Sequence, residues 1–258
     1  MGGVLYYAQV MTMDEFMEYD NGSGEWPGQG PRRGPRGEKG RNPYDGLRPW
    51  SAITHGAGAV LAAVGTLLLV MRAMALGEGA LAFAALLIYG LSMLGLYTAS
   101  TLYHCLNTGV KGRIALRKYD HISIYYLIAG SYTPICLLGL APERGVPMLA
   151  VIWALALAGT VLALLWINAP RALTAGIYLA MGWMAVFLLP ALSSALPAAG
   201  MFWLVLGGVL YTVGGVLYAV KWPGRHNPRF GCHEIFHVFI VLGSAAHFLL
   251  IYRVILTL

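Results

Sequence analysis

Seven long apolar segments, separated by short polar connections, follow one another along the chain after residue 50. Each is long enough to cross the hydrocarbon core of a bilayer, about 30 Å thick, as a helix of about 20 residues. The expected spans are Ser51–Met74, Ala80–His104, His121–Leu140, Pro147–Ile167, Leu173–Leu192, Met201–Val220 and Glu234–Ile255. A helix satisfies its own backbone in lipid, and short connections keep successive spans adjacent. The pattern therefore predicts an all-α membrane protein, a seven-transmembrane helix bundle.

The composition excludes an ordinary soluble domain. Hydrophobic residues make up 58% of the 258 residues and charged residues 11%, whereas a soluble domain carries about 25% charged residues. The net charge of +6 does not indicate a nucleic-acid partner, because the folded part offers no aromatic-interleaved basic surface. The N-terminus is acidic where a secretory signal has a basic start and an apolar core, so the first span is expected to direct insertion.

Residues 1–49 differ from the rest of the chain. Residues 21–49 are rich in Gly, Pro and Arg and cannot bury enough apolar surface to fold alone. We expect a disordered cytoplasmic tail over residues 1–49 and a membrane domain over residues 50–258. The basic residues of the tail fit two roles, attraction to anionic lipid headgroups or simple solvation, and the sequence favours neither.

The distribution of basic residues predicts the orientation in the membrane. If the N-terminus is cytoplasmic, 14 of the 17 Lys and Arg residues lie on the cytoplasmic side, and only Arg72, Arg144 and Arg253 lie outside. Cytoplasmic loops carry an excess of Lys and Arg, which strongly favours this orientation. Seven spans then place the C-terminus outside. We expect a multi-pass protein of the cell membrane.

The candidate chemistry begins with the pentapeptide His233-Glu234-Ile235-Phe236-His237 at the start of the last span. Residues four apart lie one turn above each other on the same face of a helix. The imidazoles of His233 and His237 can therefore bind one zinc ion, as in the H-E-x-x-H pattern.

Two further candidates lie at the same membrane level. His104 ends the second span and Asp120 begins the third, both on the cytoplasmic side in the expected orientation. The carboxylates after Trp50 are only Glu78, Asp120, Glu143 and Glu234. Two of them lie in outer loops, which leaves Asp120 and Glu234 beside the histidines. Ionisable groups at such positions are costly and are read as functional.

Three histidines with an open fourth position are typical of a catalytic zinc site, where a bound water has a pKa near about 7. Asp120 is then the expected general base. Ser100 lies one turn before His104, where its hydroxyl either reaches this centre or makes a plain interhelical hydrogen bond. A second interpretation also stands, in which the histidines cap helices and contact headgroups without holding a metal.

The other histidines within the spans are weaker candidates. His247 lies about 15 Å deeper than His237 at 1.5 Å per residue, too far for the same metal ion. It is expected either to hydrogen-bond another span or to line a substrate cavity. His55 and His121 lie at span ends and are expected at the membrane interface.

Three stretches carry a family resemblance: Ser100–His104, Lys118–Pro134 and His233–Phe248. Together they resemble the hemolysin III family, the bacterial branch of the progestin and adipoQ receptors, within a wider superfamily of membrane hydrolases that includes alkaline ceramidases. The resemblance covers about residues 50–258. It implies a seven-span bundle with a zinc ion near the cytoplasmic face, held by His104, His233 and His237. It also implies that Asp120 contacts the zinc-bound water and that Ser100 is the superfamily's serine.

The leading hypothesis is a zinc-dependent membrane hydrolase that acts on an amide or ester bond of an acylated membrane lipid. Members of the resembled superfamily are proposed to cleave lipid amides such as ceramide, and the bacterial branch is linked to haemolysis and membrane-lipid homeostasis. The first rival is a non-catalytic zinc protein, either a receptor-like regulator or a haemolysin. The second is an intramembrane metalloprotease with Glu234 as its base, although no acid follows Glu234 to serve as its third ligand.

Overall fold

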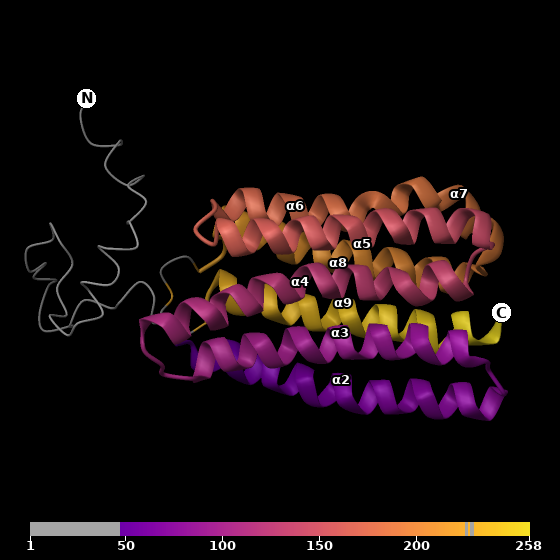
Figure 1. Ribbon diagram of the computed structural model, residues 1–258, viewed down its shortest axis with the longest axis horizontal. Coiled ribbons are helices and arrows are strands. Elements are labelled where there is room, and N and C mark those ends of the chain that lie inside the picture. The colour runs from indigo at the N-terminus through magenta and orange to yellow at the C-terminus, as the bar shows by residue number, and fades with distance from the viewer. Residues whose placement is uncertain (1–46, 225–226, 228–229) are drawn as a thin grey trace, which may run out of the picture.

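The computed structural model describes residues 47–258 except 225–226 and 228–229. Its seven spans are α2 (Pro49–Leu76), α3 (Ala80–Cys105), α4 (Val110–Leu138), α5 (Pro142–Leu165), α6 (Arg171–Trp183) with η1 (Met184–Leu188) and α7 (Leu189–Ala195), α8 (Ala198–Val220), and α9 (Cys232–Arg253) with η2 (Ile255–Thr257). Figure 1 shows these helices lying lengthwise beside one another, with consecutive spans running in opposite directions. The described residues contain no strand. The predicted all-α bundle of seven spans is confirmed.

The two ends of the bundle differ, because three histidines of the described residues gather at only one of them. The histidine end is the end at which α2, α4, α6 and α9 begin, and the opposite end is the one at which they finish (Figure 1). A cytoplasmic N-terminus and an outside C-terminus stay predictions, as does the division into residues 1–49 and 50–258. Of the expected tail, residues 1–46 lie outside the described residues.

α4 begins at Val110, well before the predicted start of the third span at His121. The additional turns are charged and are not part of the apolar stretch, so hydropathy alone does not detect them. Arg113 ties them to the end of α3: its Nη1 donates to the carbonyls of Tyr103 and Leu106, both at 2.7 Å, and its guanidinium lies 4.7 Å from the centre of the Tyr103 ring. A cation that satisfies the last carbonyls of a helix stabilises that end.

The fifth predicted span, Leu173–Leu192, is interrupted by the 3₁₀ segment η1. Pro190, in the first turn of α7, has no N–H to continue the hydrogen-bond ladder of α6. The hydroxyl of Tyr132 in α4 donates to the carbonyls of Met181 at 3.1 Å and Gly182 at 2.6 Å. The break is thus satisfied within the protein, as irregular backbone at membrane depth must be.

α9 lies in the interior of the bundle, in contact with α8, α2 and α4. The close approach to α8 depends on the first glycine of each of two Gly-Gly pairs, which are spaced seven residues apart in that helix. Gly207 packs against the ring of His247 and Gly214 against Phe239, whereas Gly208 faces open space. Without a hydrophobic driving force between helices in lipid, such close packing of small residues stabilises their association.

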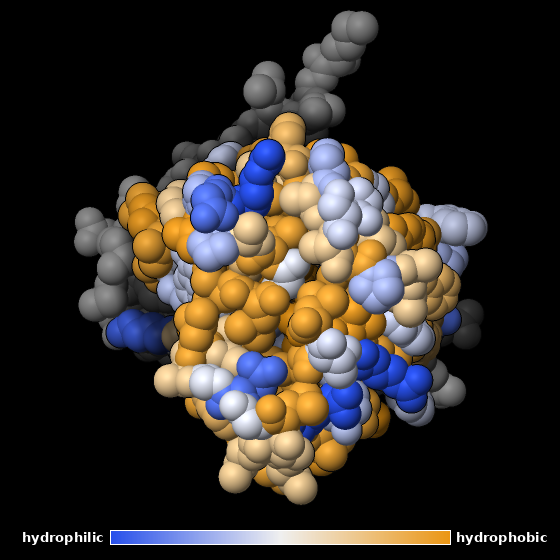
Figure 2. All heavy atoms as spheres, turned by 90° about the vertical axis from the view of Figure 1, so that its right-hand side faces the viewer, coloured by the Kyte–Doolittle hydropathy of each residue, from blue (hydrophilic) through white to orange (hydrophobic). Residues whose placement is uncertain are grey.

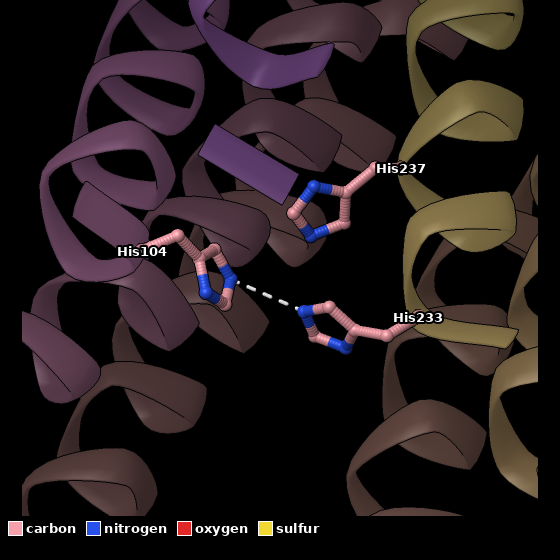
Figure 3. A group of neighbouring side chains, drawn as sticks. All are labelled: His104, His233 and His237. Atoms are coloured by element: carbon pink, nitrogen blue, oxygen red, sulfur yellow. Dashed lines mark hydrogen bonds between the residues drawn. The ribbon is translucent and has the colours of Figure 1, made fainter. Parts of the chain in front are cut away.

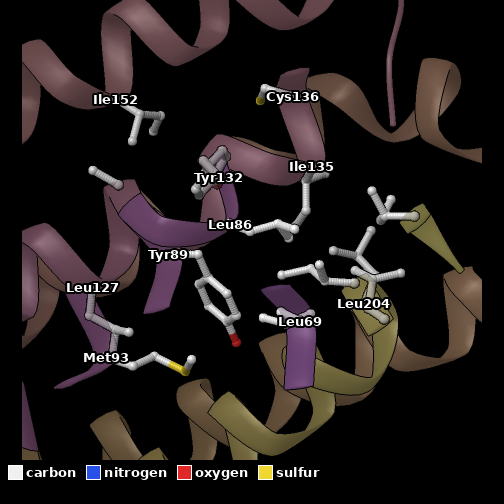
Figure 4. Packing of buried hydrophobic residues seen from close by; sticks show 14 of the residues in the cluster. Leu69, Leu86, Tyr89, Met93, Leu127, Tyr132, Ile135, Cys136, Ile152 and Leu204 are labelled. Carbon is white, nitrogen blue, oxygen red and sulfur yellow. The ribbon is translucent and has the colours of Figure 1, made fainter. Parts of the chain in front are cut away.

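Aliphatic and aromatic side chains fill the centre of the bundle. Figure 4 shows part of this buried cluster, to which α3 contributes Leu86 and Tyr89, α4 contributes Leu127 and Tyr132, and α5 contributes Ile152. Large apolar side chains are also exposed on the outer faces of the spans, among them Leu61, Leu91, Leu157, Phe187 and Phe202. Figure 2 views the opposite end, where hydrophilic residues form separate patches among apolar ones. The apolar outer faces of the spans suit contact with lipid rather than water, as expected of a multi-pass membrane protein.

Candidate metal centre

The three histidines singled out in the sequence come together at the histidine end. α3 ends at Cys105, which puts His104 on its last turn, and α9 begins at Cys232, which puts His233 and His237 on its first two turns. One nitrogen of each ring lies within 4.8 Å of the others, and Figure 3 shows the three imidazoles converging from the two helices. His104 and His237 are buried and His233 is half-buried. These side chains can hold one metal ion.

The separation of two of the rings fits a shared tetrahedral ion. Nitrogens that bind zinc at about 2.0–2.1 Å and tetrahedral angles lie about 3.3 Å apart. Nε2 of His104 and Nε2 of His233 are 3.1 Å apart, as the dashed line in Figure 3 marks. Among the described residues this group contains histidines alone. Three nitrogen ligands with an open position are typical of catalytic rather than closed structural zinc sites.

The other ring nitrogen of His237 is engaged outside the centre. Its Nδ1 lies 3.3 Å from the carbonyl oxygen of Ser51 and 3.4 Å from Oγ1 of Thr54, both in the first turns of α2. A carbonyl oxygen can only accept, so Nδ1 is the protonated nitrogen and the lone pair of the neutral ring is on Nε2. Metal-binding histidines usually donate their second N–H to a carbonyl or carboxylate in this way.

His55 lies one turn further along α2 and stacks on the ring of His237. The ring centroids are 3.6 Å apart and the planes differ by 8°. His55 is only 2% exposed, so its ring lies inside the bundle and does not face lipid headgroups. Neither of its ring nitrogens has a hydrogen-bond partner among the described residues. The stack fixes the plane in which the ring of His237 lies.

Glu234, whose role the sequence leaves open, hydrogen-bonds to the start of α2 and to the start of its own helix, α9. Its Oε1 accepts from Oγ of Ser51 at 2.9 Å and from Nη1 of Arg48 at 3.1 Å, and its Oε2 accepts from the N–H of Gly231 at 2.9 Å. The last of these closes a capping box at the start of α9, where a carboxylate is also favoured by the helix dipole. The first two tie α9 to α2, and through that junction they fix His237 beside Ser51.

Asp120 and Ser100 are buried next to each other, on α4 and α3. Oγ of Ser100 has no well-formed hydrogen bond within the described part of the chain. Asp120 is not a member of the histidine group. Two tyrosines place this carboxyl near the histidine group, since Asp120 interacts electrostatically with both Tyr103 and Tyr218. The centroid of the Tyr103 ring lies 4.8 Å from that of His104, and the centroid of the Tyr218 ring lies 5.5 Å from that of His233.

Sequence reasoning missed the contribution of the first span. Ser51 and His55 are four residues apart, and so are Ser100 and His104. This repeated Ser-x-x-x-His spacing is the signal that points to the first span, since it places a hydroxyl and an imidazole on one helix face. Nothing in the spacing shows that this face lies against α9.

The chain was compared with known protein families and curated proteins. The family described as "Haemolysin-III related" matches residues 49–248, a range that contains all three histidines. "Hemolysin-3 homolog" of Bacillus subtilis (strain 168) is 38% identical over 198 residues, which cover 77% of this chain and 89% of that protein. "Hemolysin-3" of Bacillus cereus is 34% identical over 199 residues, which cover 77% of this chain and 87% of that protein. The "Adiponectin receptor protein" of Drosophila melanogaster is 31% identical over 150 residues, which cover 51% of this chain and 33% of that protein.

Proposed function

This chain belongs to the hemolysin III family, and we propose that it is a zinc-dependent hydrolase of the cell membrane that cleaves an amide or ester bond of an acylated lipid. The observation that carries the proposal is the group of three histidines, with a nitrogen separation suited to tetrahedral zinc. An acylated lipid fits as substrate because its acyl chain already lies beside the spans. With the cytoplasmic N-terminus that the basic residues predict, the centre lies near the cytoplasmic face.

The residues of the candidate site have separate roles in the proposed hydrolysis. His104, His233 and His237 would hold a zinc ion, which would supply a Lewis acid to polarise a carbonyl and activate water. We assign Asp120 the role of general base, which takes a proton from the attacking water and returns it to the leaving nitrogen or oxygen. Ser100, next to Asp120, is assigned a hydrogen bond that orients this carboxyl or stabilises the carbonyl oxygen of the substrate.

The proposal is tested by comparing metal content with turnover in the purified full-length protein. We expect the wild type to carry zinc and to hydrolyse at least one lipid in a panel of ceramides and acylated phospholipids. His237→Ala loses the zinc, whereas Asp120→Ala retains it and lowers turnover by about 10²- to 10⁴-fold, the usual contribution of a general base. His247→Asn, which removes a buried histidine outside the group, retains the zinc.

Two results contradict the hydrolase. If the wild type carries no zinc, the metal centre itself is refuted. If zinc is present but no lipid in the panel is cleaved, the protein is the non-catalytic zinc-binding regulator instead. The similarity to a protein named an adiponectin receptor is the observation that favours this second candidate. The metalloprotease is disfavoured, because both carboxylate oxygens of Glu234 accept hydrogen bonds from Ser51, Arg48 and Gly231.

A further inference from the structure

A partly open cavity of about 250 Å³ lies at the histidine end, next to the candidate metal centre. His233 lines it and so belongs to both. The other lining residues include Arg48, Arg171, Lys221, Asn227 and Gly231, and polar atoms dominate the walls. Small-molecule pockets usually measure about 300–1,000 Å³ and are mostly apolar, so this cavity suits one polar group rather than a whole lipid molecule.

Three cations, each at the end of a different helix, line the cavity. Arg48 precedes α2, Arg171 is the first residue of α6, and Lys221 caps the end of α8. Arg48 is paired with Glu234, whereas within the described residues no carboxylate pairs with Arg171 or Lys221. The guanidinium of Arg171 lies 4.4 Å from the centre of the Tyr218 ring, which itself contacts His233. Arg171 is therefore held beside the candidate metal centre. Because only one of the three cations is paired with a carboxylate of the described residues, the cavity carries a net positive charge.

The start of one helix adds to this charge. α6 and α9 both begin at the cavity, with Arg171 and Cys232 as their first residues. The first turn of a helix presents unpaired N–H groups and the positive end of the helix dipole, which favour an anion. At α9 the carboxylate of Glu234 already occupies this position, whereas α6 has no acidic residue in its first turn. Cations, the start of α6 and an adjoining imidazole thus surround a single polar space.

We propose that this cavity binds a phosphate group, and that the group is the headgroup phosphate of a membrane lipid whose acyl linkage reaches the metal centre. Lys221 directly follows the span α8 and Arg171 is the first residue of the span that α6 begins, so the cavity lies at the level of lipid headgroups. The phosphate site stands on the cavity alone. The substrate class, an acylated phospholipid, rests on the proposed hydrolase function.

The test is lipid retention by the full-length protein, measured by native mass spectrometry. The protein is equilibrated with equal amounts of phosphatidylglycerol and monogalactosyl diacylglycerol of identical acyl chains. Both headgroups carry hydroxyl groups, but only that of phosphatidylglycerol contains a phosphate. We expect the wild type to be enriched in phosphatidylglycerol. Arg171→Gln and Lys221→Asn each lower the enrichment about fivefold, the usual effect of one basic residue near anionic headgroups. Asn is chosen at Lys221 because that residue has a left-handed conformation, with φ 58°, which Asn tolerates.

Matched controls separate this site from general charge and from metal loss. Arg144→Gln removes one exposed charge at the opposite end and leaves the enrichment unchanged. The zinc content of Arg171→Gln and Lys221→Asn equals that of the wild type. Equal retention of both lipids by the wild type, or unchanged enrichment in the double variant, overturns the proposal.

A second arm identifies the source of the phosphate, with inorganic phosphate as the probe in isothermal titration calorimetry. Binding of inorganic phosphate without enrichment of phosphatidylglycerol assigns the cavity to a soluble phosphate compound and overturns the lipid. Asp120→Ala keeps the enrichment. If enrichment is seen but no lipid is hydrolysed by the wild type, the phosphate site stands and the hydrolase fails.

Discussion

His237 is the most constrained of the three candidate ligands. Its Nδ1 is held by the carbonyl of Ser51, and its ring plane is set by the stack with His55. Such outer contacts fix the tautomer and the direction of the lone pair, and their loss typically lowers metal affinity about 10- to 100-fold. The centre is therefore shaped by α2, which contributes no ligand of its own.

We expect His55→Ala to weaken zinc binding about 2- to 10-fold, because a stacked aromatic pair contributes about 0.5–1.5 kcal/mol. His55→Phe retains a ring in the same place and keeps nearly the wild-type affinity. Both are measured by competition with a chelator of known affinity in the purified protein. An affinity of His55→Ala equal to that of the wild type refutes a role for the stack. Equal losses in both variants would instead assign the role to the ring nitrogens of His55.

The packing of α8 on α9 can be tested with two adjacent glycines of α8 that differ in their surroundings. A Cβ at Gly207 would overlap the ring of His247, whereas a Cβ at Gly208 would enter open space. We expect Gly207→Ala to destabilise the protein by about 1–3 kcal/mol through overpacking. Gly208→Ala is expected to be neutral or slightly stabilising, because Ala has the higher helix propensity. Thermal unfolding in one detergent measures both, and equal melting temperatures for the two variants contradict the packing.

The spans could be predicted from the sequence because crossing a bilayer requires only length and apolarity, and both are local properties. The charged start of α4 and the break in α6 escaped prediction, since each depends on a contact with another helix: Arg113 with the end of α3, and Tyr132 with the carbonyls beside η1. The histidines of α9 followed from helical periodicity. The contribution of His55 did not, because no local pattern shows that the first span packs against the last.

For the molecule as a whole, the sidedness in the membrane is the main prediction still to be tested. Among the cysteines Cys105 is exposed, at the histidine end, and Cys136 and Cys232 are buried. We expect a membrane-impermeant maleimide to label Cys105 in inside-out vesicles but not in intact cells, and Cys105→Ser to abolish that labelling. In the Cys105→Ser background, Glu78→Cys at the opposite end is labelled in intact cells. The reverse pattern would place the N-terminus and the metal centre outside.

The contact between the first and last spans has a consequence for how the protein is made. Ser51 and Glu234 bond across 183 residues, and His104 meets His233 across 129. At about 5–20 residues per second, the ribosome needs on the order of ten seconds to pass from His104 to its partners in α9. During that time the earlier spans are in the membrane without two of the three ligands. Loading of the proposed zinc centre would then be a late step of biosynthesis that follows insertion of the final span, and a nascent chain released before α9 would lack two of the three ligands.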